Sequence, residues 1–244
     1  MSSSPTAPTS TTGSSSISNF PSNRAAPPAP VNEPGHGTAG RTAVIACGAL
    51  GGQIREITAR RGWAVSVHNL PALLHNAPRR IAPAAAELAT RLLADGYLVA
   101  LAYADCGSYG ELDKLCERLG IRRLPGLHCY DVLGGPDRIA SLLAKEPGTY
   151  LLTDYLVRGF RRCVLVPLGL EAHPELWPDY FGHYRRLVWL AQDPEPALAA
   201  QADAVAELFG LPLTVIETGT SRLERELDRL LHDRAARPGP GGGR

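Results

Sequence analysis

The sequence of 244 residues predicts an α/β protein with a mainly parallel sheet layered with helices, arranged as two βα lobes. Short apolar runs alternate with amphipathic segments, which is the pattern of parallel strands joined by covering helices. This rhythm changes after Glu146-Pro-Gly-Thr, so the boundary between the lobes is expected near Gly148.

In the first lobe, each apolar run that predicts a strand is followed by a helical pattern. The segment over 81–94 is rich in Ala and Leu and stops at Asp95-Gly96, a fitting helix end. The segment over 111–120 carries Leu112, Leu115 and Cys116 on one face. Strands are expected at 42–47, 63–68, 98–103 and 124–129, and helices at 51–61, 81–94, 111–120 and about 137–144.

The second lobe is less regular in its first half. A strand running into a helix is expected over 150–157, and the apolar run 163–170 is ambiguous between strand and helix. Tyr180, Phe181 and Tyr184 could wall a cofactor pocket or pack in a core. Strands are then expected at 187–190 and 213–217, and helices at 195–209 and 221–231.

The two ends of the chain differ in composition from the middle. Residues 1–40 are dominated by Ser, Thr, Pro, Ala and Gly, and residues 236–244 by Gly and Pro. Such segments bury too little apolar area to offset the entropy of ordering them, so two disordered tails are expected. The α/β domain is then expected over 41–235, with lobes at about 41–148 and 149–235.

Charge and cysteine content narrow the classes of function. The net charge is +1, which gives no electrostatic case for a nucleic-acid or membrane partner. No apolar run approaches the roughly 18 residues that cross a bilayer, and no secretory signal is recognised, so a cytoplasmic protein is expected. Five cysteines, an odd number, favour reduced thiols over a disulfide framework.

Three predicted strands end at or near a cysteine. Cys47 closes the first, Cys106 follows the third and Cys129 closes the fourth. Because the carboxyl ends of parallel strands share one edge of a sheet, these thiols are expected to converge there. Thiolates at such an edge can hold zinc, cobalt or iron. Packing as core cysteines is the alternative for each, and it is the interpretation favoured for Cys116 and Cys163.

Histidines could complete such a site. His68 and His128 are expected at the rim of the sheet, and His75 lies in the loop Leu73-Leu-His-Asn-Ala-Pro. Imidazole is a common metal ligand and can also act as a general base near neutral pH. For each histidine taken singly, a loop histidine bonded to backbone is the favoured interpretation. Because polar loop residues need a reason to point inward, His75 is the favoured candidate among them for function.

The turn after the first strand allows a different function. Gly48, Gly51 and Gly52 permit the close approach of a phosphate, which predicts a nucleotide or phosphometabolite site as an alternative. The match to the dinucleotide fingerprint is partial, since the second strand ends in His68-Asn69 rather than in an acid. Catalysis by Cys106 or Cys129 without a metal is a further alternative.

Several short motifs taken together resemble domain-of-unknown-function family 1638. The resemblance covers about residues 42–231 and implies a role for Cys47, His75, Cys106, Cys129 and Glu146. Family members lie beside corrinoid-dependent methylamine or betaine methyltransferases, which implies one-carbon metabolism and a corrinoid as partner or cofactor. The motifs are Ala46-Cys-Gly-Ala-Leu, Leu74-His-Asn-Ala-Pro, Asp105-Cys-Gly, Leu127-His-Cys-Tyr, Glu146-Pro-Gly-Thr-Tyr-Leu-Leu-Thr-Asp and Tyr180-Phe-Gly-His-Tyr.

The leading hypothesis is a metal- or metallocofactor-binding protein. Cys47, Cys106 and Cys129 would supply thiolates to zinc, iron or cobalt, the last as an ion or in a corrinoid. His75, His128, solvent or a small-molecule substrate would fill the fourth position, which leaves open whether the protein is an enzyme. Glu146 and Asp154 would bind a ligand or orient a histidine, or else form a turn and a helix cap.

Overall fold

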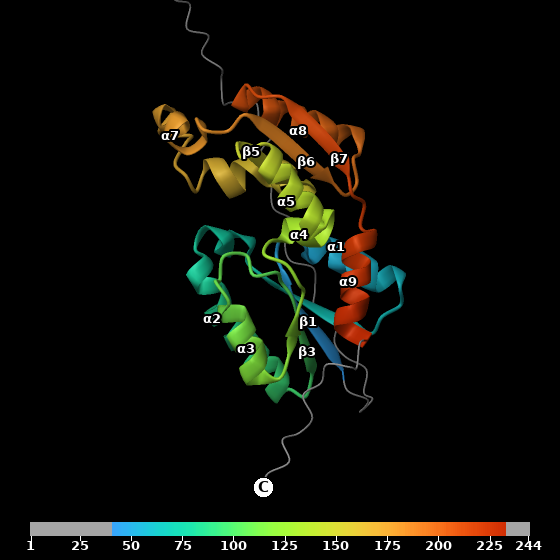
Figure 1. Cartoon of the computed structure of the whole chain (residues 1–244). Helices are drawn as coiled ribbons and strands as arrows, with labels where there is room; N and C mark the ends of the chain where they lie inside the picture. Colours follow the sequence, from blue (N-terminus) through green and yellow to red (C-terminus); the bar gives the residue numbers. More distant parts are fainter. Residues whose placement is uncertain (1–40, 233–244) are drawn as a thin grey trace, which may run out of the picture. The chain divides into compact units, whose positions relative to one another are not determined.

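The structure is a computed structural model that describes residues 41–232 (Figure 1). The tails predicted for 1–40 and 236–244 lie outside the described residues. None of the helices within 41–232 combines the length and apolar character that a membrane span needs. The fold class is confirmed as α/β, with two separate parallel sheets rather than one continuous sheet.

The first sheet has the strand order β2-β1-β3-β4. Strand β1 pairs in parallel with β2 on one side and with β3 on the other. The strand order therefore reverses between β1 and β3, and in open α/β sheets ligands bind outside the carboxyl ends of strands at such a reversal. The strands are β1 (Thr42–Cys47), β2 (Val65–Leu70), β3 (Leu98–Ala102) and β4 (Arg122–Arg123).

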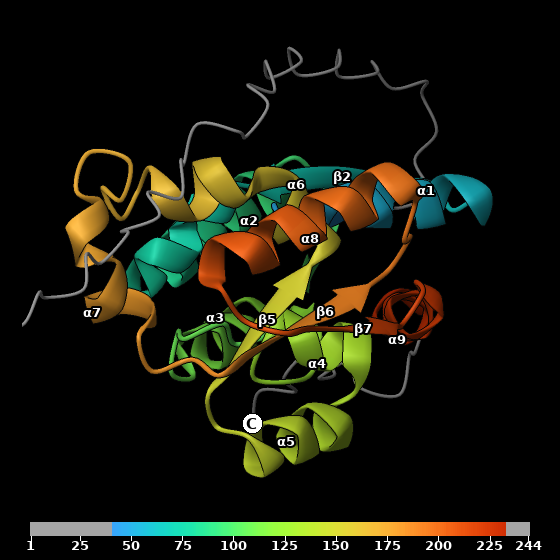
Figure 2. The same cartoon turned by 90° about the horizontal axis from the view of Figure 1, so that it is seen from above.

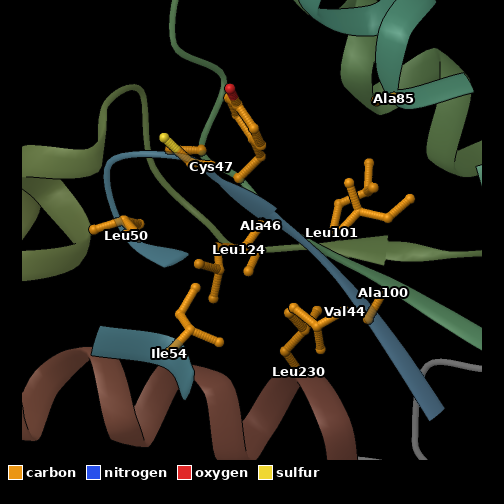
Figure 3. Close-up of a cluster of buried hydrophobic side chains, with 14 of the residues drawn as sticks. Val44, Ala46, Cys47, Leu50, Ile54, Ala85, Ala100, Leu101, Leu124 and Leu230 are labelled. Atoms are coloured by element: carbon orange, nitrogen blue, oxygen red, sulfur yellow. The ribbon is translucent and has the colours of Figure 1, made fainter. Parts of the chain in front are cut away.

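Helices cover both faces of this sheet. Figure 1 shows α2 and α3 on one side of β1 and β3, and α1 and α9 on the other. In Figure 3, Ile54 and Leu230 lie on one face of β1, and Ala85 lies on the opposite face. Burial on both faces explains why β1 is an uninterrupted apolar run. The helices are α1 (Gly51–Arg60), α2 (Ile81–Ala94), α3 (Glu111–Leu119) and α9 (Ser221–His232).

The second sheet is also parallel and has the order β5-β6-β7. Figure 2 shows α6 and α8 on one face of it and α4 and α5 on the other. Ile139 of α5 packs with Leu151, Val188 and Leu190 of the sheet. The strands are β5 (Thr149–Thr153), β6 (Arg186–Ala191) and β7 (Leu213–Glu217), and the helices are α4 (Cys129–Gly134), α5 (Pro136–Lys145), α6 (Asp154–Phe160) and α8 (Pro196–Phe209).

The two lobes exchange helices. Helices α4 and α5 follow the first sheet in sequence, but α5 covers the second. Helix α9 follows the second sheet, but its residues Leu223, Leu227 and Leu230 belong to the core of the first. The chain therefore crosses between the lobes more than once, and each sheet depends on a helix from the other half of the sequence.

Most predicted elements are confirmed, and two need correction. Strand β2 spans Val65–Leu70, so His68 lies inside it, with Nε2 3.1 Å from Ser66 Oγ, rather than at its end. The strand predicted over 124–129 is wrong, because β4 ends at Arg123 and Cys129 begins α4. Pro125 lacks an N–H for pairing, and Gly126 has a left-handed φ of +102°, so an extended run cannot continue there.

The ambiguous apolar run 163–170 is neither a strand nor a regular helix. Helix α6 kinks at Gly159 and continues into a π-helical turn, η4 (Arg161–Leu165). The aromatic segment that follows forms η5 (Pro174–Leu176) and α7 (Trp177–Phe181). The Tyr150 ring lies 5.7 Å from that of Phe181 and 5.0 Å from that of Tyr184, so these rings pack with one another in the second lobe.

Candidate metal centre

Three cysteines and one histidine meet at the carboxyl edge of the first sheet. The Sγ atom of Cys129 lies 3.5 Å from that of Cys106 and 3.7 Å from that of Cys47. The Nε2 atom of His75 lies 3.7 Å from the Cys47 Sγ. Two sulfurs that share a tetrahedral zinc ion at about 2.3 Å are about 3.8 Å apart, so this spacing suits one bound ion.

The tightest group of potential ligands contains two of these cysteines and the histidine. The ligand atoms of Cys47, His75 and Cys129 all lie within 4.8 Å of one another. Cys106 adjoins this group through its contact with Cys129. The sequence therefore predicted the convergence of the three cysteines correctly, and it identified the histidine that joins them.

Cys47 is the last residue of β1, and its side chain is fully buried. The chain turns at Gly48, where a Cβ atom would lie 2.5 Å from the carbonyl oxygen of Leu70 and 2.7 Å from the amide nitrogen of Ala72. Only glycine lets the turn pass this close to the end of β2. Gly48 thus places Cys47 beside the segment that carries His75.

Cys106 lies in a strained loop after β3, with a left-handed φ of +50°. The Asp105 carboxylate holds this loop, because it accepts hydrogen bonds from the Ser108 hydroxyl at 2.7 Å and from the Gly110 amide at 2.8 Å. The Cys106 amide donates to the Leu127 carbonyl at 2.8 Å, which ties the loop to the segment before α4. Such strain in a non-glycine residue persists only where the surroundings enforce it, and it is common at functional sites.

Cys129 is the first residue of α4, and Asp131 fixes the turn that leads to it. The Asp131 carboxylate accepts hydrogen bonds from the amides of Leu127 at 2.7 Å and His128 at 3.2 Å. A Cβ atom at Gly126 would lie 2.9 Å from that of Asp131, so glycine permits this close approach. The turn and the Asp131 bonds together bring Cys129 to Cys106.

His75 lies in the 3₁₀ helix η2 (Ala72–Asn76) and is oriented by its backbone. Its Nδ1 donates to the Ala72 carbonyl at 2.8 Å, and its ring stacks on Tyr103 with centroids 5.9 Å apart. With Nδ1 bonded to this carbonyl, Nε2 faces the sulfur of Cys47 and carries the proton that a metal ion would replace. Metal-binding histidines are held by this kind of bond, which fixes the tautomer and the ring direction.

The crowded thiols change one another's proton affinity. A hydrogen bond from Cys129 lowers the pKa of Cys106 to about 6 and that of Cys47 well below its usual value, against the effect of burial. Donating these bonds raises the pKa of Cys129. Burial lowers the pKa of His75, but bonds to Cys106 and Cys47 outweigh it and raise the pKa to about 11. The cluster therefore holds thiolate character, which a metal ion requires.

A pocket of about 270 Å³ opens beside the cluster. His75, Cys106 and Cys129 contribute to its wall, whereas Cys47 lies outside the lining. Residues from the carboxyl ends of the second sheet form the opposite wall, among them Tyr155 and Gln192. Asp154, directly after β5, is a predicted ligand-binding residue on this side, but Tyr155 and Gln192 are not predicted, although the rule that ligands gather at the carboxyl ends of parallel strands points to residues after β5 and β6.

The other predicted site residues lie elsewhere or have structural contacts. His128 borders the pocket, but its side chain is half exposed and lies outside the Cys47–His75–Cys129 group. Glu146 accepts a hydrogen bond from the Gly148 amide at 2.9 Å, in the turn before β5, and is not part of the pocket lining. Cys116 packs in the core of the first lobe, where burial raises its pKa to about 11, and Cys163 lines the pocket.

Two of the three glycines in the first turn are explained by packing. A Cβ atom at Gly48 would meet the backbone near the end of β2, and one at Gly51 would lie 2.1 Å from the Asn69 Oδ1, whereas one at Gly52 would meet nothing within 4 Å.

We expect Gly48→Ala to lower the free energy of unfolding by about 1–3 kcal/mol through overpacking. Gly52→Ala should raise it by about 0.5 kcal/mol, because alanine favours the helix. Urea denaturation of both variants checks this, and equal stabilities would contradict the packing role of Gly48.

The sequence matches a protein-family model. Residues 69–227 match the model of DUF1638, described as a protein of unknown function. The match is shorter than the resemblance over 42–231 and begins after Cys47, but it includes His75, Cys106 and Cys129. No curated protein and no solved structure matches the chain. Since the matched segment spans well over half of the sequence, the chain belongs to the DUF1638 family.

Proposed function

We propose that this protein binds a transition-metal ion through Cys47, His75 and Cys129, with Cys106 as a fourth and exchangeable ligand. The observation that carries this proposal is the spacing of 3.5 and 3.7 Å between the sulfur of Cys129 and its two neighbours. Thiolate and imidazole ligands together select zinc, iron(II) or cobalt(II) over harder ions such as magnesium.

Packing alone does not explain the cluster. Cys116 shows how a structural cysteine is placed here, on the apolar face of α3 beside Leu112 and Leu115. In contrast, the Cys129 sulfur contacts those of Cys106 and Cys47, and the Cys47 sulfur contacts an imidazole nitrogen. Neighbouring thiolates repel in an interior of low dielectric constant, and a divalent cation between them would remove that repulsion.

The position of Cys106 supports an exchangeable role. It lines the pocket from a strained loop and lies outside the Cys47–His75–Cys129 group, whereas Cys47 ends a central strand and is not part of the lining. Structural zinc sites are closed by four protein ligands, and catalytic sites keep a position for water or substrate. A ligand that can leave would let an ion at this site receive a molecule from the pocket.

The alternatives have less support. Catalysis by Cys106 or Cys129 without a metal is one alternative, since both line the pocket, but their sulfurs lie 3.5 Å apart, a pairing that a single nucleophile would not need. A pocket of 270 Å³ lies below the usual range for drug-sized ligands, so it favours a free ion over a bound corrinoid macrocycle. A role in one-carbon metabolism stays a prediction from the family resemblance.

Elemental analysis of the full-length protein, purified without oxygen, tests the metal site. We expect close to one equivalent of zinc, iron or cobalt per chain. The Cys116→Ser variant should retain the same amount, because Cys116 lies on α3 outside the cluster. A content below about a tenth of an equivalent in protein with fully reduced thiols, and no uptake when these ions are added, would contradict the proposal.

A further inference from the structure

We propose that the pocket binds a small, uncharged and mainly apolar thiol whose sulfur becomes a ligand of the metal, a step that depends on the metal site proposed above. Three features of the pocket lead to this class of ligand: the charge of its lining, the state of its polar groups, and the side from which it reaches the cluster.

The lining carries no carboxylate, lysine or arginine side chain among the described residues. His75 would be neutral as a metal ligand and the His128 side chain is half exposed, so a charged ligand would leave water and find no partner of opposite charge along the enclosed walls. The cost of burying an unpaired charge is several kcal/mol, which selects against phosphates, carboxylates and amines. The ligand is therefore uncharged over the part that the pocket encloses.

Several polar groups of the lining already have partners. The Tyr130 hydroxyl donates to the Leu151 carbonyl at 3.4 Å, and the Thr153 hydroxyl accepts from the Leu156 amide at 3.4 Å. The Gln192 side chain donates to the Leu190 carbonyl and accepts from the Gln53 amide group. The Thr153 hydroxyl hydrogen and the Tyr150 hydroxyl have no hydrogen-bond partner among the described residues, so only a small number of hydrogen bonds remain for a ligand there. Apolar contact with Leu50, Leu133, Leu156 and Val164 would instead provide most of the affinity.

The metal end of the pocket determines the donor atom. His75, Cys106 and Cys129 face the pocket, so an ion held by the cluster would be reached from this side. An ion bound by thiolates and imidazole favours a soft donor, and a thiol bound to zinc is deprotonated. On binding, the S–H bond of the ligand would break, its sulfur would replace that of Cys106 on the metal, and the proton would pass to the Cys106 thiolate released when its own bond to the metal breaks. No oxidant or reductant takes part.

Cobalt(II)-substituted full-length protein gives a direct test, because thiolate–cobalt charge transfer is visible in the absorption spectrum. Titration with phenylmethanethiol should change this spectrum and saturate at one equivalent. Mercaptosuccinate, a charged thiol, should bind at least tenfold more weakly. Benzyl alcohol, which has the same shape but a hard donor, should leave the charge-transfer band unchanged.

Two valines in the same segment provide a matched pair of variants. Val164 is buried and lines the pocket, whereas Val166 is 51% exposed and does not. Val164→Phe should keep the cobalt but weaken phenylmethanethiol binding at least tenfold, and Val166→Phe should change neither. If Val164→Phe does not fold, Leu156→Phe blocks the same pocket, since Leu156 also lines it.

The outcomes separate the two proposals. Failure of the native chain to bind cobalt would overturn the metal site and the thiol site together. Cobalt binding with equal affinity for both thiols, or with no effect of a pocket-blocking variant, would overturn only the thiol site. Selective binding of the apolar thiol that is lost in the blocked pocket would support both.

Discussion

Replacing Cys129 with serine is expected to weaken metal binding by at least about a hundredfold, the largest effect of any single change in the cluster. The Cys129 sulfur contacts both other clustered sulfurs, at 3.5 and 3.7 Å, so its position is central to the proposed site. Loss of a group that only orients a ligand costs about 10–100-fold in metal affinity, and loss of a ligand itself should cost more. A serine hydroxyl is a hard and weakly acidic donor that does not replace a thiolate.

Competition against a chromophoric chelator would measure this affinity for three variants side by side. Cys106→Ser should lose only about tenfold, because Cys106 is proposed to be exchangeable and lies outside the Cys47–His75–Cys129 group. Cys116→Ser should bind like the native chain, since its thiol packs in the core. If Cys129→Ser kept native affinity in a folded protein, the proposed ligand set would be wrong.

The part of this site that the sequence predicted depends on parallel strands. Cys47 ends β1 and Cys106 follows β3, and these two neighbouring strands flank the reversal of strand order. Strand ends can be located from apolar runs, so their convergence follows from the fold class. His75 was favoured because it is a polar residue in a loop, and its bond to the Ala72 carbonyl shows how the backbone directs it inward.

Cys129 reached the predicted place for a reason the sequence did not reveal. It does not end a strand but begins α4, and it meets Cys106 because the Cys106 amide bonds to the Leu127 carbonyl. Such a contact between loops depends on the left-handed conformations at Cys106 and Gly126, which hydrophobic periodicity does not encode. Position at the sheet edge was therefore predictable, whereas the element that carries the thiol was not.

Asp154 after β5 is a predicted ligand-binding residue, but the approach of the second pocket wall to the cysteine cluster was not predictable, for a related reason. Helices α5 and α9 each pack on the sheet formed by the other half of the sequence. The spacing of apolar residues within a helix predicts that it has a buried face, but not which sheet covers that face. The π-helical turn that carries Cys163 follows a kink at Gly159. The spacing of apolar residues predicts regular helices and strands, and it predicts neither a kink nor a π-helical turn. The strands of the second lobe were predictable, but their approach to the cysteine cluster was not.

Replacing Asp154 with alanine is expected to lower the free energy of unfolding by about 3–5 kcal/mol, the largest effect on stability. Its carboxylate is buried and accepts hydrogen bonds from the Trp189 indole at 2.9 Å, the Gln192 amide at 3.1 Å and the Asp193 amide at 2.8 Å. It therefore joins the end of β5 to the end of β6. Alanine would leave three donors without an acceptor, and each such loss costs about 1–3 kcal/mol when buried.

Urea denaturation, with exposed Asp203→Ala on α8 as the control, would check this expectation. The control should stay within about 0.5 kcal/mol of the native value, as surface substitutions usually do. Asp154→Asn should also destabilise, because its amide group would place a donor against one of the backbone amides that the carboxylate now accepts. A loss below about 1 kcal/mol for Asp154→Ala would show that water or a rearranged Gln192 replaces the carboxylate.

Folded Asp154→Ala should still bind one equivalent of metal, because all four proposed ligands come from residues before β5. Stability and metal content would then respond to different residues, as expected if the second lobe forms the pocket wall and the first holds the ion.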